Sequence, residues 1–597
     1  MNDFPLHVLR DYALIADGER GALIGPRGDI VWLCAPRWPS DAVFSHLIGG
    51  DGLYAVTPAG EFVWGGYYED GTLIWRSRWV TRSGLTECYE ALAYPAERDK
   101  AVVLRRVVAE RGPAQVRVVL DPRAGFGQHA LRSAHRDDQD TWTGRTGDLH
   151  VRWSGDVAGA KVGRAGRHSR LELTLNLAEG EYRDLVLEIA SAPLRESPPE
   201  ADWLWKCTRE RWAQVVPPLR GTLAPRDARQ SLVVLRGLTA GTGAMVAAAT
   251  MSLPERAQQG RNYDYRYAWI RDQSYAGQAA AAAGAYPVLD DAVRFVSERL
   301  LADGRELAPA YTVDGGHVPD QRRLDLPGYP GGFDLVGNWV NKQFQLDGLG
   351  EALMVLATAA NSDRLDSDGW RALEIAADAI AQRWQEKDAG IWELDNHAWT
   401  HSRLTCAAAL RNAAVNAAQP QAAEWLALAD VILADTATNA VHPSGRWQRS
   451  ASDSSLDAAL LLPPVRGALP GEDPRTLHTL DAYLAELTQD GYAHRFRHGK
   501  GPLGHAEGAF LLCGFFVALA LHQQGRELEA ARWFERTRTA CGSPGLFSEE
   551  FDVTERQLRG NLPQAFVHAL LLESAARLAT DWQQQASLTQ TTPARGA

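Results

Sequence analysis

Two glutamates that lie far apart in the chain have surroundings suited to acid–base chemistry. Glu393 directly follows Trp392, and Glu549 opens an acidic cluster with Glu550 and Asp552. A general acid must be protonated near neutral pH, and burial beside an aromatic side chain would raise the pKa of Glu393. A general base must stay ionised, so Glu549 needs a positive or hydrogen-bonding partner. One acid and one base together could hydrolyse a glycosidic bond.

Each glutamate also has a structural explanation. Glu393 could cap the next helix or form a salt bridge at its start, and Glu549 could belong to a solvated acidic loop. The local sequence alone favours these structural roles, so other parts of the chain must decide.

Residues 262–272 place aromatic side chains around one arginine–aspartate pair. Tyr265 and Trp269 precede Arg271 and Asp272 in this stretch. The planar guanidinium donates as a fork and the carboxylate accepts, so the pair could bind adjacent sugar hydroxyls with fixed geometry. An internal ion pair at the start of a helix is an equally good explanation.

A second cationic cluster contains Arg495 and Arg497, separated by Phe496. One of these arginines could line a pocket and bind a sugar hydroxyl. Without further context, a solvated loop is the simpler explanation.

Composition restricts the class of partner. The chain has 597 residues, more than one typical domain, and 45% of them are hydrophobic. The formal net charge of -12 argues against nucleic acids and anionic membranes, which both favour cationic surfaces. A neutral substrate rich in hydroxyl groups fits better. Most of the 20 tryptophans are expected in the cores, although some could stack on sugars.

Metal, cofactor and targeting signals are not evident. The six cysteines are scattered, the histidines lack His-Glu-x-x-His spacing, and no glycine-rich stretch leads into a Lys-Ser/Thr signature. We therefore expect no metal and no cofactor. The first residues lack a basic segment followed by an apolar run, and no stretch is long and apolar enough to span a bilayer. These features predict a cytoplasmic protein with reduced thiols.

Residues 1–199 have the pattern of an antiparallel β-sandwich domain. Short runs rich in Val and Leu are separated by Gly, Asp and Pro turns, and residues 73–80 alternate between apolar and polar side chains. The clearest of the short runs are 29–33, 101–107, 115–120 and 171–177.

The pattern becomes helical after this domain. We expect a linker over residues 200–226 with a helix at 203–216, a catalytic domain over 227–582, and a frayed tail at 583–597. The predicted helices of the catalytic domain are 227–238, 272–283, 287–301, 342–361, 367–387, 400–416, 419–435, 453–461, 472–486, 507–524, 526–541 and 561–580.

Twelve helices in one domain favour a toroid of paired helices, the (α/α)6 arrangement, over a plain bundle. Long irregular segments between the helices, residues 314–338 above all, could form the walls of a funnel at one end of the toroid. The fold class expected is therefore α+β, with an N-terminal antiparallel β-sandwich followed by a C-terminal (α/α)6 toroid.

The order of the motifs resembles that of the glucoamylase-like glycoside hydrolases of family 15, in particular their bacterial branch. The resemblance covers nearly the whole chain, and residues 262–272 are its most specific part. The other segments that carry it are 11–17, 28–34, 337–338, 342–347, 390–393, 507–510, 548–552 and 560–566.

This resemblance implies roles for the catalytic pair. Glu393 matches the general acid and Glu549 the general base of an enzyme that releases glucose from the non-reducing end with inversion. Arg271 and Asp272 match the pair that binds the terminal glucose.

The resemblance also implies several residues around the bound sugar. Tyr265 and Trp269 match aromatic residues of that subsite, and Trp392 lies beside the acid. Arg495 is the better match to the pocket arginine of the family, with Arg497 left open. The chain departs from the family at Asn341, where relatives can carry a platform aromatic, and Trp339 lies two positions away.

The substrate implied is a small α-linked gluco-oligosaccharide. Segments 64–68 and 75–79 resemble the branch that acts on isomaltose, and we expect isomaltose or isomalto-oligosaccharides on that basis. An α-1,4 glucoamylase or a trehalase of the same family is the first alternative. A sugar phosphorylase, an epimerase or a non-catalytic sugar-binding protein on the same toroid is the second. The oligomeric state is left open.

Overall fold

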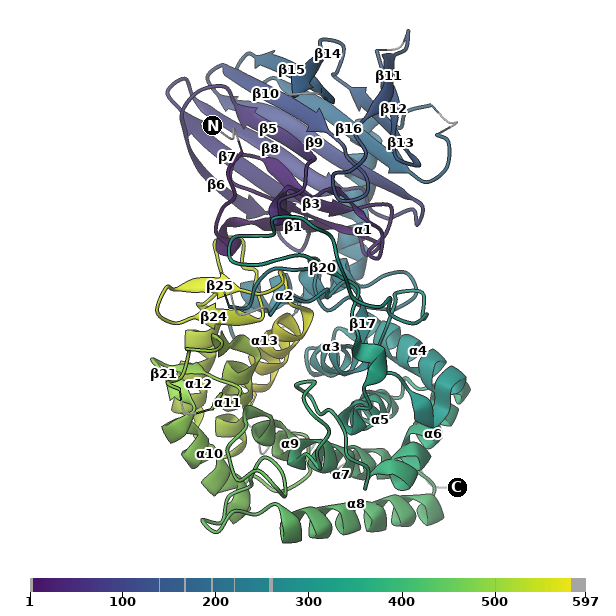
Figure 1. Ribbon diagram of the computed structural model, residues 1–597, viewed down its shortest axis with the longest axis vertical. Helices are drawn as coiled ribbons and strands as arrows, with labels where there is room; N and C mark the ends of the chain where they lie inside the picture. The colour runs from purple at the N-terminus through teal and green to yellow at the C-terminus, as the bar shows by residue number, and fades with distance from the viewer. Residues whose placement is uncertain are drawn as a thin grey trace.

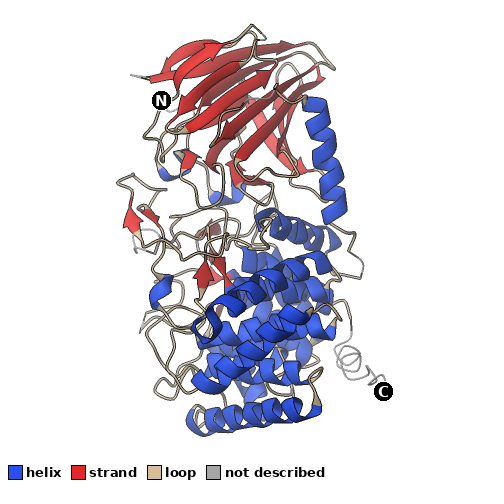
Figure 2. Cartoon of the chain, turned by 90° about the vertical axis from the view of Figure 1, so that its right-hand side faces the viewer, coloured by secondary structure: helices blue, strands red, loops and turns tan. Residues whose placement is uncertain are grey.

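The computed structural model describes residues 4–580, apart from 139, 166–167, 195–196, 220, 257–260 and 500. Strands gather at one end of the molecule and helices form a ring at the other (Figure 1). A quarter turn about the long axis shows the same division (Figure 2). The predicted order, β-structure followed by helices, is confirmed. The tail predicted at 583–597 lies outside the described residues.

The strands form two large antiparallel sheets in the described part of the chain. The first has the order β1-β2-β3-β5-β10-β15-β14, with β4 paired to β3. Its strands are β1 (Ala13–Ala16), β2 (Gly21–Ile24), β3 (Asp29–Cys34), β4 (Ala42–Phe44), β5 (Leu53–Pro58), β10 (Ala114–Asp121), β14 (Lys161–Ala165) and β15 (His168–Leu177).

The second sheet has the order β11-β12-β13-β16-β9-β8-β7-β6. Its strands are β6 (Phe62–Tyr68), β7 (Trp75–Thr81), β8 (Leu85–Leu92), β9 (Lys100–Arg111), β11 (Arg132–Arg136), β12 (Trp142–Thr146), β13 (Leu149–Gly155) and β16 (Tyr182–Ala190). One hydrophobic core contains residues of both sheets, which is the packing of a sandwich.

Strand β7 shows why this part of the chain folds as sheet. Trp75, Ser77 and Trp79 are buried, whereas Arg78 and Val80 are exposed. Successive side chains of a strand point to opposite faces, so the alternation read in the sequence becomes one face in the core and one in solvent.

Helix α1 (Ala201–Val215) follows the sheets and packs against β9 and β16. Trp205 and Trp212 of this helix are buried. The toroid begins after it, with α2 (Pro225–Leu238).

The remaining helices form an inner and an outer ring in the described part of the chain (Figure 1). Each inner helix contacts the next, and the last contacts the first, which closes the ring. The inner helices are α3 (Ile270–Ala282), α5 (Leu346–Asn361), α7 (Thr400–Ala414), α9 (Leu462–Val465), α11 (Leu511–Gln523) and α13 (Ala565–Arg577). The outer helices are α2, α4 (Tyr286–Asp303), α6 (Ser367–Arg383), α8 (Gln419–Asn439), α10 (Pro474–Glu486) and α12 (Glu527–Arg538).

The helix predicted at 453–461 is wrong. Asp453 accepts hydrogen bonds from the backbone N–H and the hydroxyl of Ser455, and Asp457 accepts from the N–H of Ala459. Such local side-chain bonds compete with helix formation. Only a 3-10 turn at Ala458–Leu461 and the short α9 follow.

Loops precede the inner helices α3, α5, α7, α11 and α13. The sandwich holds the loop that precedes α3. Arg266 is buried, forms an ion pair with Asp264 and donates to the carbonyl oxygen of Ser40 at 2.8 Å. Trp32 of β3 donates to the carbonyl oxygen of Ala249 at 2.8 Å. The sandwich therefore fixes the backbone around residues 249–266, just before α3.

Candidate active site

Glu393 lies in a tight turn between α6 and α7. Its N–H donates to the carbonyl oxygen of Gly390 at 3.1 Å, and the N–H of Leu394 donates to that of Ala389 at 2.9 Å. Gly390 has φ 66° and Glu393 has φ 56°. A left-handed conformation is unfavourable for a glutamate and, where it is observed, often marks a functional position.

Two side chains at the start of α3, those of Trp269 and Arg271, lie against the Glu393 carboxyl. The indole N–H of Trp269 donates to Oε1 at 2.8 Å, and Nη1 of Arg271 lies 4.0 Å from the same oxygen. The side chain of Glu393 keeps 26% of its surface exposed. Burial raises the pKa of this carboxyl, and Arg271 and Trp269 oppose the rise.

Glu549 comes directly before β24 (Glu550–Asp552), which pairs with β23 (Ala509–Phe510) and β25 (Gln557–Arg559). The hydroxyl of Tyr265 is 3.2 Å from both carboxyl oxygens of Glu549. Burial and the neighbouring carboxyl of Glu255 raise the pKa of Glu549, and Arg495 opposes them. Glu549, at the corner before β24, is therefore a second buried carboxyl with a raised pKa.

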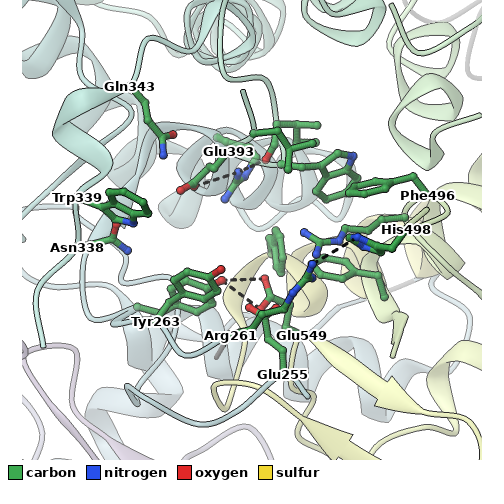
Figure 3. Close-up of a pocket in the computed structure, with 18 residues that line it drawn as sticks. Glu255, Arg261, Tyr263, Asn338, Trp339, Gln343, Glu393, Phe496, His498 and Glu549 are labelled. Carbon is green, nitrogen blue, oxygen red and sulfur yellow. Dashed lines mark hydrogen bonds and ion pairs between the residues drawn. The ribbon is translucent and has the colours of Figure 1, made fainter. Parts of the chain in front are cut away.

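Both glutamates line one cavity of about 180 Å³. Figure 3 shows them on opposite sides of it, with Glu393 facing the space from the turn before α7 and Glu549 from the side of Tyr263 and Glu255. Two carboxyls that face each other across a space can protonate and deprotonate groups of one bound molecule.

Arg271 and Asp272 occupy the first turn of α3. The Nε–H of Arg271 donates to Oδ1 of Asp272 at 3.0 Å, and Nη1 donates to the carbonyl oxygen of Ile391 at 2.8 Å. Arg271 lines the cavity, whereas Asp272 is fully buried behind it and Trp269 also lies outside the lining. The structure thus places Arg271 at the wall and Asp272 as its support.

Arg495, and not Arg497, lines the cavity. Its guanidinium lies 4.5 Å from the ring centroid of Phe510 and 5.3 Å from that of Trp392. Arg497 is exposed and donates to backbone carbonyls at the surface. Trp392 also lines the cavity, and its indole N–H donates to Asp457 at 2.8 Å.

A wider cavity of about 670 Å³ adjoins the first and shares Trp339, Gln343 and Glu393 with it. Trp339 is 56% exposed, so its ring is accessible to a ligand. Asn341 lies outside both linings, and its side-chain amide donates to the carbonyl oxygen of Val318 at 2.6 Å. The aromatic available at this rim is therefore Trp339.

Sequence reasoning missed several cavity residues, including Glu255, Arg261, Tyr263 and His498 as site members. Glu255 and Arg261 precede the motif at 262–272, and an acidic and a basic residue so close to that motif were the available signal. Nothing in the local sequence pairs Glu255 with Glu549, because the fold alone brings them together.

The described residues contain no group of three or more His, Cys, Asp or Glu side chains that could hold a metal ion. Within the same residues, no helix is both long and apolar enough to cross a membrane.

Comparison with known proteins assigns the chain to a family. The model of the glycosyl hydrolases family 15 matches residues 233–576, which is more than half of the chain. The chain belongs to the glycosyl hydrolases of family 15. It is therefore a glycoside hydrolase, as its resemblance implied. A second family model, described as trehalase-like, N-terminal, matches residues 7–192.

Similar proteins cover almost the full length. A trehalase of Mycobacterium tuberculosis is 30% identical over 97% of this chain and 90% of its own. Trehalase 1 of Sulfolobus acidocaldarius is 26% identical over 94% of this chain and 98% of its own. The isomaltose glucohydrolase of Kribbella flavida is 31% identical, but over only 44% of this chain and 67% of its own.

Among solved structures, a bacterial glucoamylase complexed with acarbose matches with a TM-score of 0.71 at 13% identity. The match covers 98% of this chain and 96% of the glucoamylase. This likeness concerns the fold, and with the closed inner ring it confirms the predicted β-sandwich followed by an (α/α)6 toroid.

Proposed function

We propose that this α-glucoside hydrolase acts on trehalose, the disaccharide in which two glucose units are joined through both anomeric carbons, and releases glucose with inversion. The observation that carries the substrate is the set of trehalases similar to this chain over nearly its whole length. The match of residues 7–192 to a trehalase-like N-terminal model supports it independently of the catalytic domain.

In this proposal Glu393 is the general acid and Glu549 the general base. Glu393 protonates the oxygen that leaves, while Glu549 removes a proton from a water that attacks the anomeric carbon on the opposite face. The positions of the two carboxyls on opposite sides of the cavity support this division. The raised pKa of Glu393 supports its role as the proton donor.

The shape of the site supports exo action on a disaccharide. The inner cavity has room for a small group beside Arg271 and Arg495, and the wider cavity begins at Glu393 and Trp339. We infer that the glucose to be attacked occupies the inner cavity, held by Arg271 with Asp272 behind it. The leaving glucose then lies in the wider cavity against Trp339.

Isomaltose, the substrate favoured by segments 64–68 and 75–79, is the second candidate. Its support is the Kribbella flavida isomaltose glucohydrolase, which matches less than half of this chain. The trehalases match nearly all of it, so the comparisons do not support the isomaltose preference.

The test is a comparison of kcat/KM for trehalose, isomaltose and maltose, each with and without inorganic phosphate. We expect trehalose to exceed the other two by at least about tenfold, and glucose to be the only product in every case. A preference for isomaltose would overturn the substrate proposal. A sugar phosphate among the products would indicate a phosphorylase, and binding without turnover would indicate a sugar-binding protein.

A further inference from the structure

Glu255 is a buried carboxyl on the wall of the cavity, and none of the catalytic roles above uses it. It is 4% exposed, and Figure 3 shows it beside Glu549. Its backbone lies in the segment that leads to the 262–272 motif, and the carbonyl oxygen of Pro254 accepts from the N–H of Gly560 at 3.0 Å.

Gly560 lies behind both side chains. A Cβ added there would lie 3.6 Å from Cγ of Glu255 and 3.4 Å from Cβ of Glu549. The backbone therefore directs the two side chains into the same space, where each carboxyl affects the pKa of the other. Two ionised carboxylates so close would repel each other, whereas a proton on one of them lets it donate a hydrogen bond to the other.

Several segments bring titratable groups to Glu255. Besides Glu549, these groups belong to the cations Arg261 and Arg495, the neutral phenols Tyr263 and Tyr265, and the acids Glu507 and Glu550.

Glu507 forms ion pairs with the arginines near Glu255. Its carboxylate pairs with Arg495 at 2.5 Å and with Arg261 at 2.8 Å. Although burial opposes it, the charge of Arg495 holds the pKa of Glu507 far below its usual range. Among the described residues, no ion pair joins Glu255 to a cation. Glu507 is therefore the ionised partner of the arginines, and Glu255 is left to share a proton with Glu549.

We propose that Glu255 and Glu549 hold a single proton between them, and that Glu255 is a positioning residue that takes up this proton when Glu549 acts as the base. The inference rests on the proposed function of Glu549. The Tyr265 hydroxyl, 3.2 Å from both carboxyl oxygens of Glu549, favours the negative charge on Glu549. Arg495 and Arg261 favour the negative charge on Glu255 instead, so the two carboxyls compete for one proton.

The proton balance of one turnover follows. A water lone pair bonds to the anomeric carbon, the electrons of the broken bond pass to the leaving oxygen, and that oxygen takes the proton of Glu393. The proton of the water passes to Glu549, so Glu255 and Glu549 are both protonated and Glu393 is ionised. The site resets when one proton leaves the pair to solvent and Glu393 takes one up.

The first test compares Glu255→Gln with Glu255→Ala in pH–rate profiles on trehalose. The glutamine amide is neutral, as the protonated Glu255 is, and it still donates to Glu549, so the acid limb of Glu255→Gln should stay where it is in the wild type. Glu255→Ala removes the donor, which raises the pKa of Glu549 and moves the acid limb to higher pH. We expect kcat of Glu255→Gln to stay within about threefold of the wild type, and Glu255→Ala to lose at least about tenfold in kcat with little change in KM. Equal losses in the two variants would overturn the proposal. A fall of the acid limb in Glu255→Gln would also overturn it, because it would show that Glu255 carries a like charge in the wild type.

The second test does not depend on turnover. Infrared difference spectra at pH 6 report the carbonyl band of protonated carboxylic acids. We expect Glu255→Gln, Glu549→Gln and the double variant each to lose the band of one protonated carboxyl, because either single substitution leaves the remaining glutamate ionised. A loss of two bands in the double variant would show two separate protons and overturn the proposal. Glu351→Gln is the calibration variant, since Glu351 is buried on α5 with a pKa raised to about 7, lies outside the cavity lining and should leave the acid limb unchanged.

The two tests separate the two proposals. Loss of one band in both single variants without trehalose turnover would keep the shared proton and reject the substrate. Turnover of trehalose without loss of the band in either single variant would reject the shared proton alone.

Discussion

The turn around Glu393 and the sheet corner around Glu549 differ in the groups that lie next to each carboxyl. Glu393 has a cation, Arg271, and neutral donors, Trp269 and Gln343, near it. Glu549 lies beside a second carboxyl, that of Glu255 (Figure 3). Burial raises the pKa of both glutamates. Burial is a cause common to both shifts, and the carboxyl of Glu255 is an additional cause at Glu549. The different neighbours of the two carboxyls suggest different tasks.

A general acid benefits from this shift directly, because it must carry a proton at the working pH. A general base does not, because it must lose its proton. A second carboxyl beside the base resolves this conflict if it takes the proton itself. The direction of a pKa shift alone therefore does not assign the roles of general acid and general base. The groups next to each carboxyl do.

The largest effect is expected from Glu549→Gln. Removal of the base should lower kcat on trehalose by about 10²–10⁴-fold with little change in thermal stability, as read by steady-state kinetics and circular dichroism. Glu555→Gln is the matched control, because Glu555 is an exposed carboxyl of the same segment and should keep full activity. If a properly folded Glu549→Gln retained most of its activity, Glu549 would not be the base.

A substrate whose leaving group needs no proton separates the two regions. Glu393→Gln should lose about 10²–10⁴-fold in kcat on trehalose but keep much of its activity on α-glucosyl fluoride, since fluoride leaves without an acid. Glu549→Gln should lose activity on both substrates. The ratio of fluoride to trehalose hydrolysis is the measurement, and equal losses of Glu393→Gln on the two substrates would contradict its role as the acid.

Substitutions of the neutral donors should shift opposite limbs of the pH–rate profile. Trp269→Phe removes a donor to Glu393, which raises the pKa of the acid, and activity then persists to higher pH on the alkaline limb. Tyr265→Phe removes the donor to Glu549, which raises the pKa of the base, and activity is then lost earlier as the pH falls. Each variant should lose about tenfold in kcat, since a hydrogen bond to a charged group contributes about 1.5–3 kcal/mol.

The pH range of activity should therefore widen in Trp269→Phe and narrow in Tyr265→Phe. Profiles from pH 4 to 9 on trehalose check this pair together. A shift of the same limb in both variants would show that the two donors do not serve different carboxyls.

The smallest effect concerns Glu351, a buried carboxyl outside both regions. Burial raises its pKa from the ordinary value of 4.5 to about 7 in the folded protein. Its contribution to stability is full below pH 4.5 and is lost as the pH rises to about 7, because only the unfolded chain ionises in that window. Glu351→Gln should flatten the dependence of Tm on pH between these values. An unchanged slope in thermal melts would mean that Glu351 is ionised in the folded protein.

The fold was predictable to a large extent because its signals are local. The alternation at β7 and the Ala- and Leu-rich composition of the helical segments are visible in the sequence. Asp473 with Pro474 correctly marks the start of α10. The helix predicted at 453–461 was wrong because an aspartate side chain there accepts hydrogen bonds from a nearby backbone N–H and a serine hydroxyl.

The site was predictable only in part. Glu393, Glu549 and Arg495 are found on the cavity wall, where motif matches suggested them. The burial of Asp272 behind Arg271 and the pairing of Glu255 with Glu549 depend on contacts between distant segments. No pattern within one segment contains that information.

The most direct test of opposed acid and base is the configuration of the glucose released from trehalose in ¹⁸O-labelled water. We expect the first products to be α- and β-glucose in equal amounts, with the label on the anomeric oxygen of the β-anomer only, because water attacks one ring with inversion and the other ring leaves unchanged. Label on α-glucose at the earliest times would show retention and would contradict direct attack by a water that Glu549 activates.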